Sequence, residues 1–80
     1  MNNEQLKRGN ELQKDIEDFQ EKVKAAESAL KFPENVSIKI HFNAYGPYEL
    51  DTILKEEAIM IFKQHYEELL EKAKLEFNSL

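Results

Sequence analysis

One short stretch near the middle of the chain alternates strictly between apolar and polar side chains. Apolar residues occupy every second position and β-branched residues are frequent, a pattern typical of a half-buried β-strand. The apolar side comprises Val36, Ile38, Ile40 and Phe42, and the polar side comprises Ser37, Lys39 and His41. A strand is therefore predicted near residues 36–43, with residues 48–50 as a candidate return strand.

A heptad pattern precedes this strand. Apolar or small residues recur at alternating spacings of three and four, at Gly9, Leu12, Ile16, Phe19, Val23, Ala26 and Leu30. Such a narrow seam is typical of a helix that faces one partner helix, and it predicts a helix over residues 4–31. Asn2 or Asn3 can cap its start, whereas the capping-box pattern at residues 10–13 would begin the helix at Glu11. Pro33 disfavours helical geometry at the preceding residue and ends the helix near Lys31.

A second long helix is predicted over residues 52–78. The Gly-Pro pair within residues 44–47 is expected to redirect the chain after the strand, and Asp51 is a suitable N-cap. The main apolar stripe of this helix comprises Ile59, Phe62, Tyr66, Leu69, Ala73 and Leu80. A second row widens the apolar face in the first half and predicts deeper burial there, at Leu54, Ala58, Ile61 and His65.

These elements define an α+β fold class, in which a long helix, a short β-strand or hairpin and a second long helix form a single domain over residues 1–80. Matched helix lengths favour antiparallel packing. A lone hairpin is marginally stable in water, and an open strand edge is a liability. We therefore expect a homodimer or larger assembly through the strand and the heptad seams. The predicted interface residues are Val36, Ile38, Ile40, Phe42, Ile16, Phe19, Val23, Phe62, Tyr66 and Leu69.

Composition narrows the classes of function. A chain of 80 residues with a net charge of −5 lacks the basic surface of a nucleic-acid-binding protein. It contains no cysteine, so disulfides and thiolate metal sites are excluded. Neither a membrane-spanning run nor a signal-peptide pattern is recognisable. The expectation is a cytoplasmic protein without direct contact with nucleic acid or membrane.

The residues that carry chemistry are few, and their spacing does not indicate catalysis. His41 falls on the strand and His65 on the second helix, and neither stands in a metal-binding motif. Acidic pairs such as Glu56 and Glu57 are expected to lie in solvent, without the burial that an acid–base catalyst requires. With only two glycines in the chain, no phosphate-binding loop exists. We predict a non-enzymatic protein without a cofactor.

A group of polar and aromatic residues on and after the predicted strand favours the binding of a small ligand. Hydrogen-bond donors, a cation and aromatic rings follow one another along the polar side of the strand and the residues after it. Lys39 can pair with a phosphate or carboxylate, and the rings offer stacking surfaces. The candidate ligand-binding residues are Lys39, His41, Asn43, Tyr45 and Tyr48. The alternative is that the tyrosines pack over the helix ends and the polar side is merely solvated.

The order of heptad-bearing helix, short β element and C-terminal helix resembles small coiled-coil-containing proteins of bacterial viruses. The last helix carries the likeness in its pattern from Ile59 through Phe62 and Tyr66 to Leu69. The resemblance implies an accessory protein that blocks a host defence by binding a host protein, in the cytoplasm of the host cell. Two alternatives remain: a sponge that sequesters a small anionic or nucleotide-like ligand at the polar strand face, and a coiled-coil scaffold protein.

Overall fold

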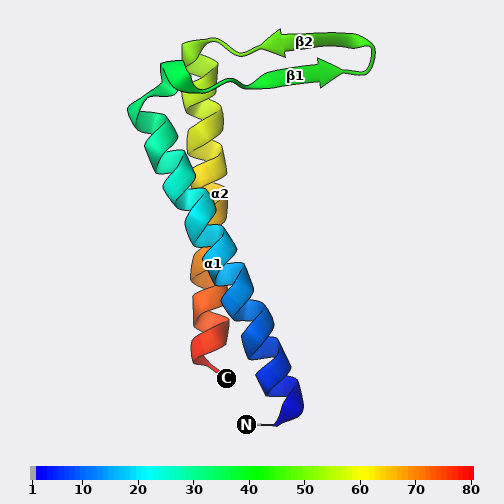
Figure 1. The fold of residues 1–80 in the computed structure, drawn as a ribbon, viewed down its shortest axis with the longest axis vertical. Helices are drawn as coiled ribbons and strands as arrows, with labels where there is room; N and C mark the ends of the chain where they lie inside the picture. Colours follow the sequence, from blue (N-terminus) through cyan, green and yellow to red (C-terminus); the bar gives the residue numbers. More distant parts are fainter. Residues whose placement is uncertain (1) are drawn as a thin grey trace.

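In the computed structural model, which describes residues 2–80, two long antiparallel helices are joined by a short β-hairpin. The elements in chain order are α1 (Asn3–Lys31), the 3-10 turn η1 (Pro33–Asn35), β1 (Lys39–Phe42), β2 (Tyr45–Glu49) and α2 (Thr52–Asn78). The hairpin extends sideways from the end of the helical pair at which α1 ends and α2 begins (Figure 1). The predicted helix–hairpin–helix order is thus confirmed. Met1 of the expected domain lies outside the described residues.

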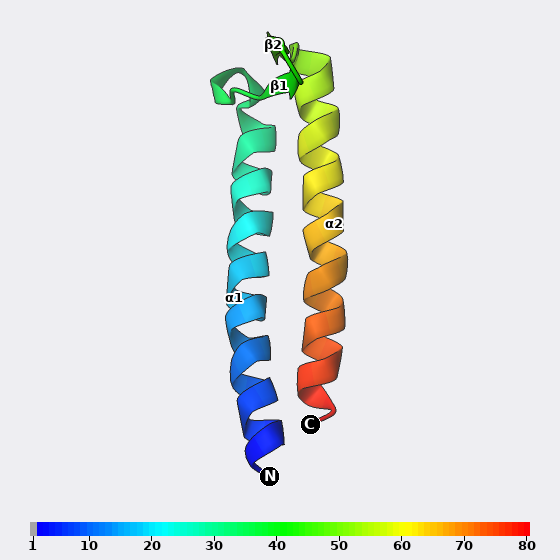
Figure 2. The ribbon, with the colours of Figure 1, turned by 90° about the vertical axis from the view of Figure 1, so that its right-hand side faces the viewer.

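The heptad positions form the seam between the two helices, which lie side by side in Figure 2. Leu12 is the one large side chain among residues 2–80 that is fully buried, with 1% of its surface exposed. Aromatic rings cross the seam where Phe19 meets Tyr66, with ring centroids 5.8 Å apart. Small buried residues, Ala26 on α1 and Ala73 on α2, let the helices approach closely. The seam is one layer thick, so the core of this chain is narrow.

Side-chain caps define the helix starts. Asn2 accepts a hydrogen bond from the Gln5 backbone at 2.8 Å, and the Gln5 side chain accepts one from the Asn2 backbone at 3.1 Å. This reciprocal capping box begins α1 at Asn3 and overrides the alternative start at Glu11. The predicted cap of α2 is confirmed, since the Asp51 carboxylate accepts from the Leu54 backbone at 2.9 Å. Within residues 2–80, neither helix contains a stretch both long enough and apolar enough to cross a membrane.

The helical conformation at Gly9 leads to a stability prediction. Glycine inside a helix costs about 1 kcal/mol relative to alanine. A methyl group added at Gly9 would lie 3.6 Å from Leu80 Cδ1 and 3.9 Å from Phe77, which is ordinary packing distance. We expect Gly9→Ala to raise the thermal midpoint of helix unfolding, followed by circular dichroism, by about 4–8 °C. A lower midpoint would show that this end of the helix pair does not pack as described.

The hairpin is shorter and placed differently than the sequence pattern predicts. β1 begins at Lys39, so Val36 and Ile38 precede the strand. The chain is in the 3-10 turn η1 at residues 33–35, and Val36 caps the end of this turn, so strand pairing starts only after it. Asn43 adopts a left-handed backbone with φ of 52°, and the reversal therefore falls at residues 43–44 instead of at the Gly-Pro pair. The return strand accordingly spans Tyr45–Glu49, earlier than the expected residues 48–50.

A β-bulge accommodates the Gly-Pro pair within β2. Ile40 pairs with Tyr48 and Phe42 pairs with Tyr45, so two residues of β2 stand opposite one residue of β1. Gly46 lies in this bulge with φ of 110°. A Cβ atom at this position would lie 2.8 Å from the Ile40 carbonyl oxygen, a separation that side chains do not tolerate. Only glycine therefore fits the bulge without a shift of the backbone.

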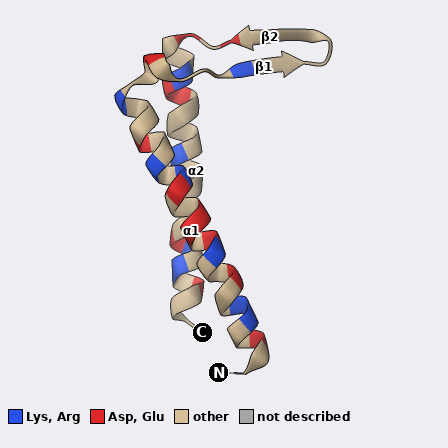
Figure 3. Cartoon of the chain, viewed as in Figure 1, with Lys and Arg blue, Asp and Glu red and all other residues tan. Residues whose placement is uncertain are grey.

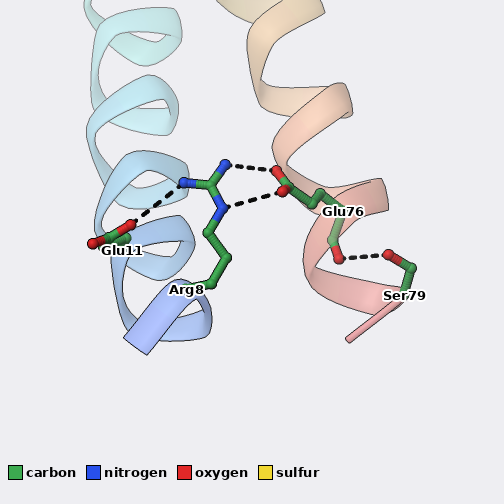
Figure 4. A network of polar contacts seen from close by, with 4 residues as sticks. All are labelled: Arg8, Glu11, Glu76 and Ser79. Carbon is green, nitrogen blue, oxygen red and sulfur yellow. Dashed lines mark hydrogen bonds and ion pairs between the residues drawn. The ribbon is translucent and has the colours of Figure 1, made fainter. Parts of the chain in front are cut away.

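An ion-pair network joins the helix ends far from the hairpin (Figure 4). The Arg8 guanidinium donates from Nε to Glu76 Oε1 at 3.1 Å and from a terminal nitrogen to Glu76 Oε2 at 2.8 Å. Glu11 accepts a further, longer bond from the same guanidinium at 3.5 Å. Glu76 interrupts the apolar stripe of α2 between Ala73 and Leu80, and in the structure it links the two helices.

This network predicts an acid-dependent loss of stability. Hydrogen bonds from Arg8 lower the pKa of Glu76 relative to its ordinary value. A carboxyl group whose pKa is lowered by folding stabilises the fold above its unfolded pKa, about 4.3, and that contribution is lost as the pH falls below it. We expect the urea midpoint to fall less between pH 7 and pH 3 in Glu76→Gln than in the wild type. Equal losses in the two proteins would show that the pair does not form in solution.

Candidate functional site

The most distinctive surface of the molecule is an apolar corner between the hairpin and the start of α2. It is a groove of about 440 Å³ with a single charged residue on its rim. We call this surface the apolar corner, and its lining residues are Ile40, Phe42, Tyr48, Leu50, Leu54, Glu57, Ala58 and Ile61. The corner forms because the hairpin extends sideways from the helices (Figure 1).

The hairpin contributes its apolar side to the corner. Ile40 and Tyr48 are directly paired across the strands, so both side chains emerge on the same face. Phe42 lies two residues beyond Ile40 and packs against Tyr48, with ring centroids 6.1 Å apart. These three residues line the groove, yet all three remain exposed because no other element within residues 2–80 covers them.

Helix α2 contributes the second apolar row. The sequence pattern predicts that this row is buried beside the strand, but Leu54 is 47% exposed and Ile61 is 69% exposed. The reason is geometric: residues 54, 58 and 61 share a helical face that points into the corner, while the seam with α1 occupies a different face. Met60 lies on the other side of the helix pair and is 59% exposed. The first half of α2 therefore exposes large apolar side chains on more than one face.

One hydrogen bond ties the start of the hairpin to helix α2, and a second closes the base of the hairpin. Lys55 is buried on α2, and its ammonium donates to the Val36 carbonyl at 3.0 Å. The Leu50 backbone donates to the Ile38 carbonyl at 2.9 Å and closes the base of the hairpin. The corner is thus held in place by the chain itself. A lysine inside an apolar helical stretch was the sequence signal for this anchor, but a lysine at that spacing equally fits a solvent-facing position.

The predicted ligand-binding residues do not form one site. Tyr48 lies on the apolar face with Ile40, whereas Lys39 and His41 alternate onto the other face of β1. Tyr45 pairs with Phe42, and Asn43 occupies the turn. Lys39 stands directly opposite Glu49, so this cation has an acidic cross-strand neighbour. The strands carry no other charge, as their mostly tan colour in Figure 3 shows.

Most of the predicted interface residues are used within the chain. Side chains from the heptad pattern lie half-buried between α1 and α2, namely Ile16, Phe19, Val23, Tyr66 and Leu69. Phe62 remains partly exposed and packs on Tyr66, with ring centroids 4.7 Å apart. Val36 and Ile38 are half-buried near the hairpin base, which leaves Ile40 and Phe42 available for contact with another molecule.

A second groove lies along the helices, but its chemistry differs. It has a volume of about 320 Å³ and is lined by Val23, Glu67, Leu70, Glu71, Lys74 and Leu75. Half of these residues are charged, which suits a solvated helical surface better than a docking face. Among the residues that the structure describes, no group of histidine and acidic side chains is arranged to hold a metal ion. The apolar corner is therefore the candidate functional site.

Comparison of the chain with protein-family models, with curated proteins and with solved structures finds no match.

Proposed function

We propose that this protein is a small non-enzymatic interaction protein, and that the apolar corner is its contact surface for another protein chain. The observation that supports the proposal most strongly is the exposure of large apolar side chains on two elements that meet at the corner. A contiguous exposed apolar surface on a small protein marks an interaction site. The corner combines aromatic and aliphatic side chains, the composition that anchors protein interfaces.

The total surface of the chain supports the same proposal. A compact monomer of 9.4 kDa is expected to expose about 5,000 Å². This chain exposes 6414 Å², about 1,400 Å² more than that expectation. Stable protein interfaces bury about 800 Å² on each partner, and permanent ones bury more. The excess surface is thus large enough for a stable protein–protein contact.

The setting that we propose follows from the resemblance to small proteins of bacterial viruses. In that setting the protein would serve as an accessory factor that engages a host protein, with its charged helical faces turned outward. A ligand sponge is less well supported, because Tyr48 and Lys39 lie on opposite faces of the hairpin and Glu49 faces Lys39.

Native mass spectrometry of the protein, purified from its own cells under non-denaturing conditions, tests this proposal. We expect complexes whose mass includes at least one further protein chain. A single chain as the only species would contradict the proposal. A single chain that retains a small molecule would instead support the ligand sponge.

A further inference from the structure

We infer that the chain that fills the apolar corner is a second copy of this protein, in a two-fold dimer that places both hairpins at the same end. This inference rests on the proposed function, because it names the occupant of the same surface. The contact would be isologous, so that the hairpin of each copy lies against the α2 face of the other.

The shape of the corner is self-complementary. Each copy offers a projecting apolar element, the face of the hairpin that carries Ile40 and Phe42. Each copy also offers an apolar helical face to receive it, with Leu54 and Ile61. A two-fold rotation places the hairpin face of each copy against the α2 face of the other, so both pairs of apolar faces are buried at once. With about 1,400 Å² of excess surface per chain, two copies match the size of a permanent homodimer interface.

The distribution of apolar surface selects the orientation of the two copies. The row formed by Leu54, Ala58 and Ile61 is apolar, but the same face of α2 continues with His65, Glu68 and Lys72 away from the hairpin. Charged residues are frequent along the helices towards the chain termini, whereas the hairpin carries few (Figure 3). An arrangement with opposite ends together would press apolar halves onto charged halves. Apolar surface meets apolar surface only when the hairpin ends of the two copies lie together.

Molar mass measured by light scattering or sedimentation tests whether a second copy of the chain occupies the apolar corner. We expect a dimer at micromolar concentration for the wild type and a monomer for Ile61→Lys, because a charge would be buried without a partner. The matched control is Met60→Lys, which introduces the same charge at the neighbouring residue on the other side of the helix pair and leaves a dimer. Both side chains are exposed in the single chain, so helical circular dichroism should be unchanged in both variants.

The alternative results are distinguishable. A monomeric wild type that forms a complex with a different protein would overturn the dimer and leave the proposed function intact. A monomeric wild type that binds no protein would overturn both. A dimer that survives Ile61→Lys but dissociates with Met60→Lys would show that the interface lies on the other face.

A spin-label distance tests the orientation. The chain has no cysteine, so Lys31→Cys places a single label per chain at the hairpin end of α1. With like ends together, the two labels are separated by the width of a four-helix bundle, and we expect a distance below about 30 Å. With opposite ends together, they are separated by about the length of a helix, roughly 40 Å or more. The longer distance would overturn the inferred orientation.

Discussion

Replacing Leu12 with alanine is expected to lower the free energy of unfolding by about 2–5 kcal/mol, the range for deletion of a buried leucine side chain. Leu12 is 1% exposed, and the core consists of a single seam between two helices, so few neighbours can move to fill the cavity. A domain of this size is only marginally stable. We therefore expect a large fall in the thermal midpoint, or loss of the folded state, measured by circular dichroism and urea denaturation.

Leu6→Ala is the matched control on the same helix. Leu6 is 55% exposed, and its replacement is expected to change stability by no more than about 0.5 kcal/mol. Equal losses for the two variants would contradict the assignment of Leu12 to the buried seam.

Replacing Gly46 with alanine is expected to disrupt the hairpin while the helices persist. The added Cβ would lie 2.8 Å from the Ile40 carbonyl oxygen, and φ of 110° is unfavourable for any residue with a side chain. Such strain costs about 1–3 kcal/mol, which an exposed two-stranded hairpin cannot offset. We expect loss of the β1–β2 signature in the amide and Cα chemical shifts, with helical shifts retained away from the corner.

The control for this variant is Asn43→Gly, in the same hairpin. Asn43 already has a positive φ of 52°, which glycine adopts without strain, so the strand shifts should persist. A Gly46→Ala protein with intact strand pairing would show that the bulge is not required. Because the hairpin supplies half of the corner, Gly46→Ala should also weaken the inferred dimer.

The helical part of the fold was predictable because its signals are local and periodic. The heptad from Leu12 to Leu30 specifies a seam, and both helix spans and the Asp51 cap agree with the sequence pattern. The position of the reversal was not predictable in this way. It depends on a left-handed Asn43 and on a bulge at Gly46, and a Gly-Pro pair alone fits a turn equally well.

The candidate site was only partly predictable. The apolar side of β1 was recognised at Ile40 and Phe42, but the sequence could not show which helical face the hairpin would approach. Apolar periodicity on α2 does not distinguish burial within the chain from burial against another chain, so Leu54 and Ile61 were expected in the core. Tyr48 was grouped with Lys39 and His41 as a candidate ligand residue, because the bulge, which places it on the apolar face, could not be inferred from alternation.

An isotope-filtered nuclear Overhauser experiment on a mixture of labelled and unlabelled chains decides whether a second copy fills the apolar corner. It detects only contacts between different molecules, and a chain of 9.4 kDa is well suited to it. If the corner is filled by a second copy, the methyl groups of Ile61 and Leu54 will show intermolecular contacts to Ile40 and Phe42. Intermolecular contacts that involve Met60 but none of these four residues would contradict the account, as would the absence of any intermolecular contact.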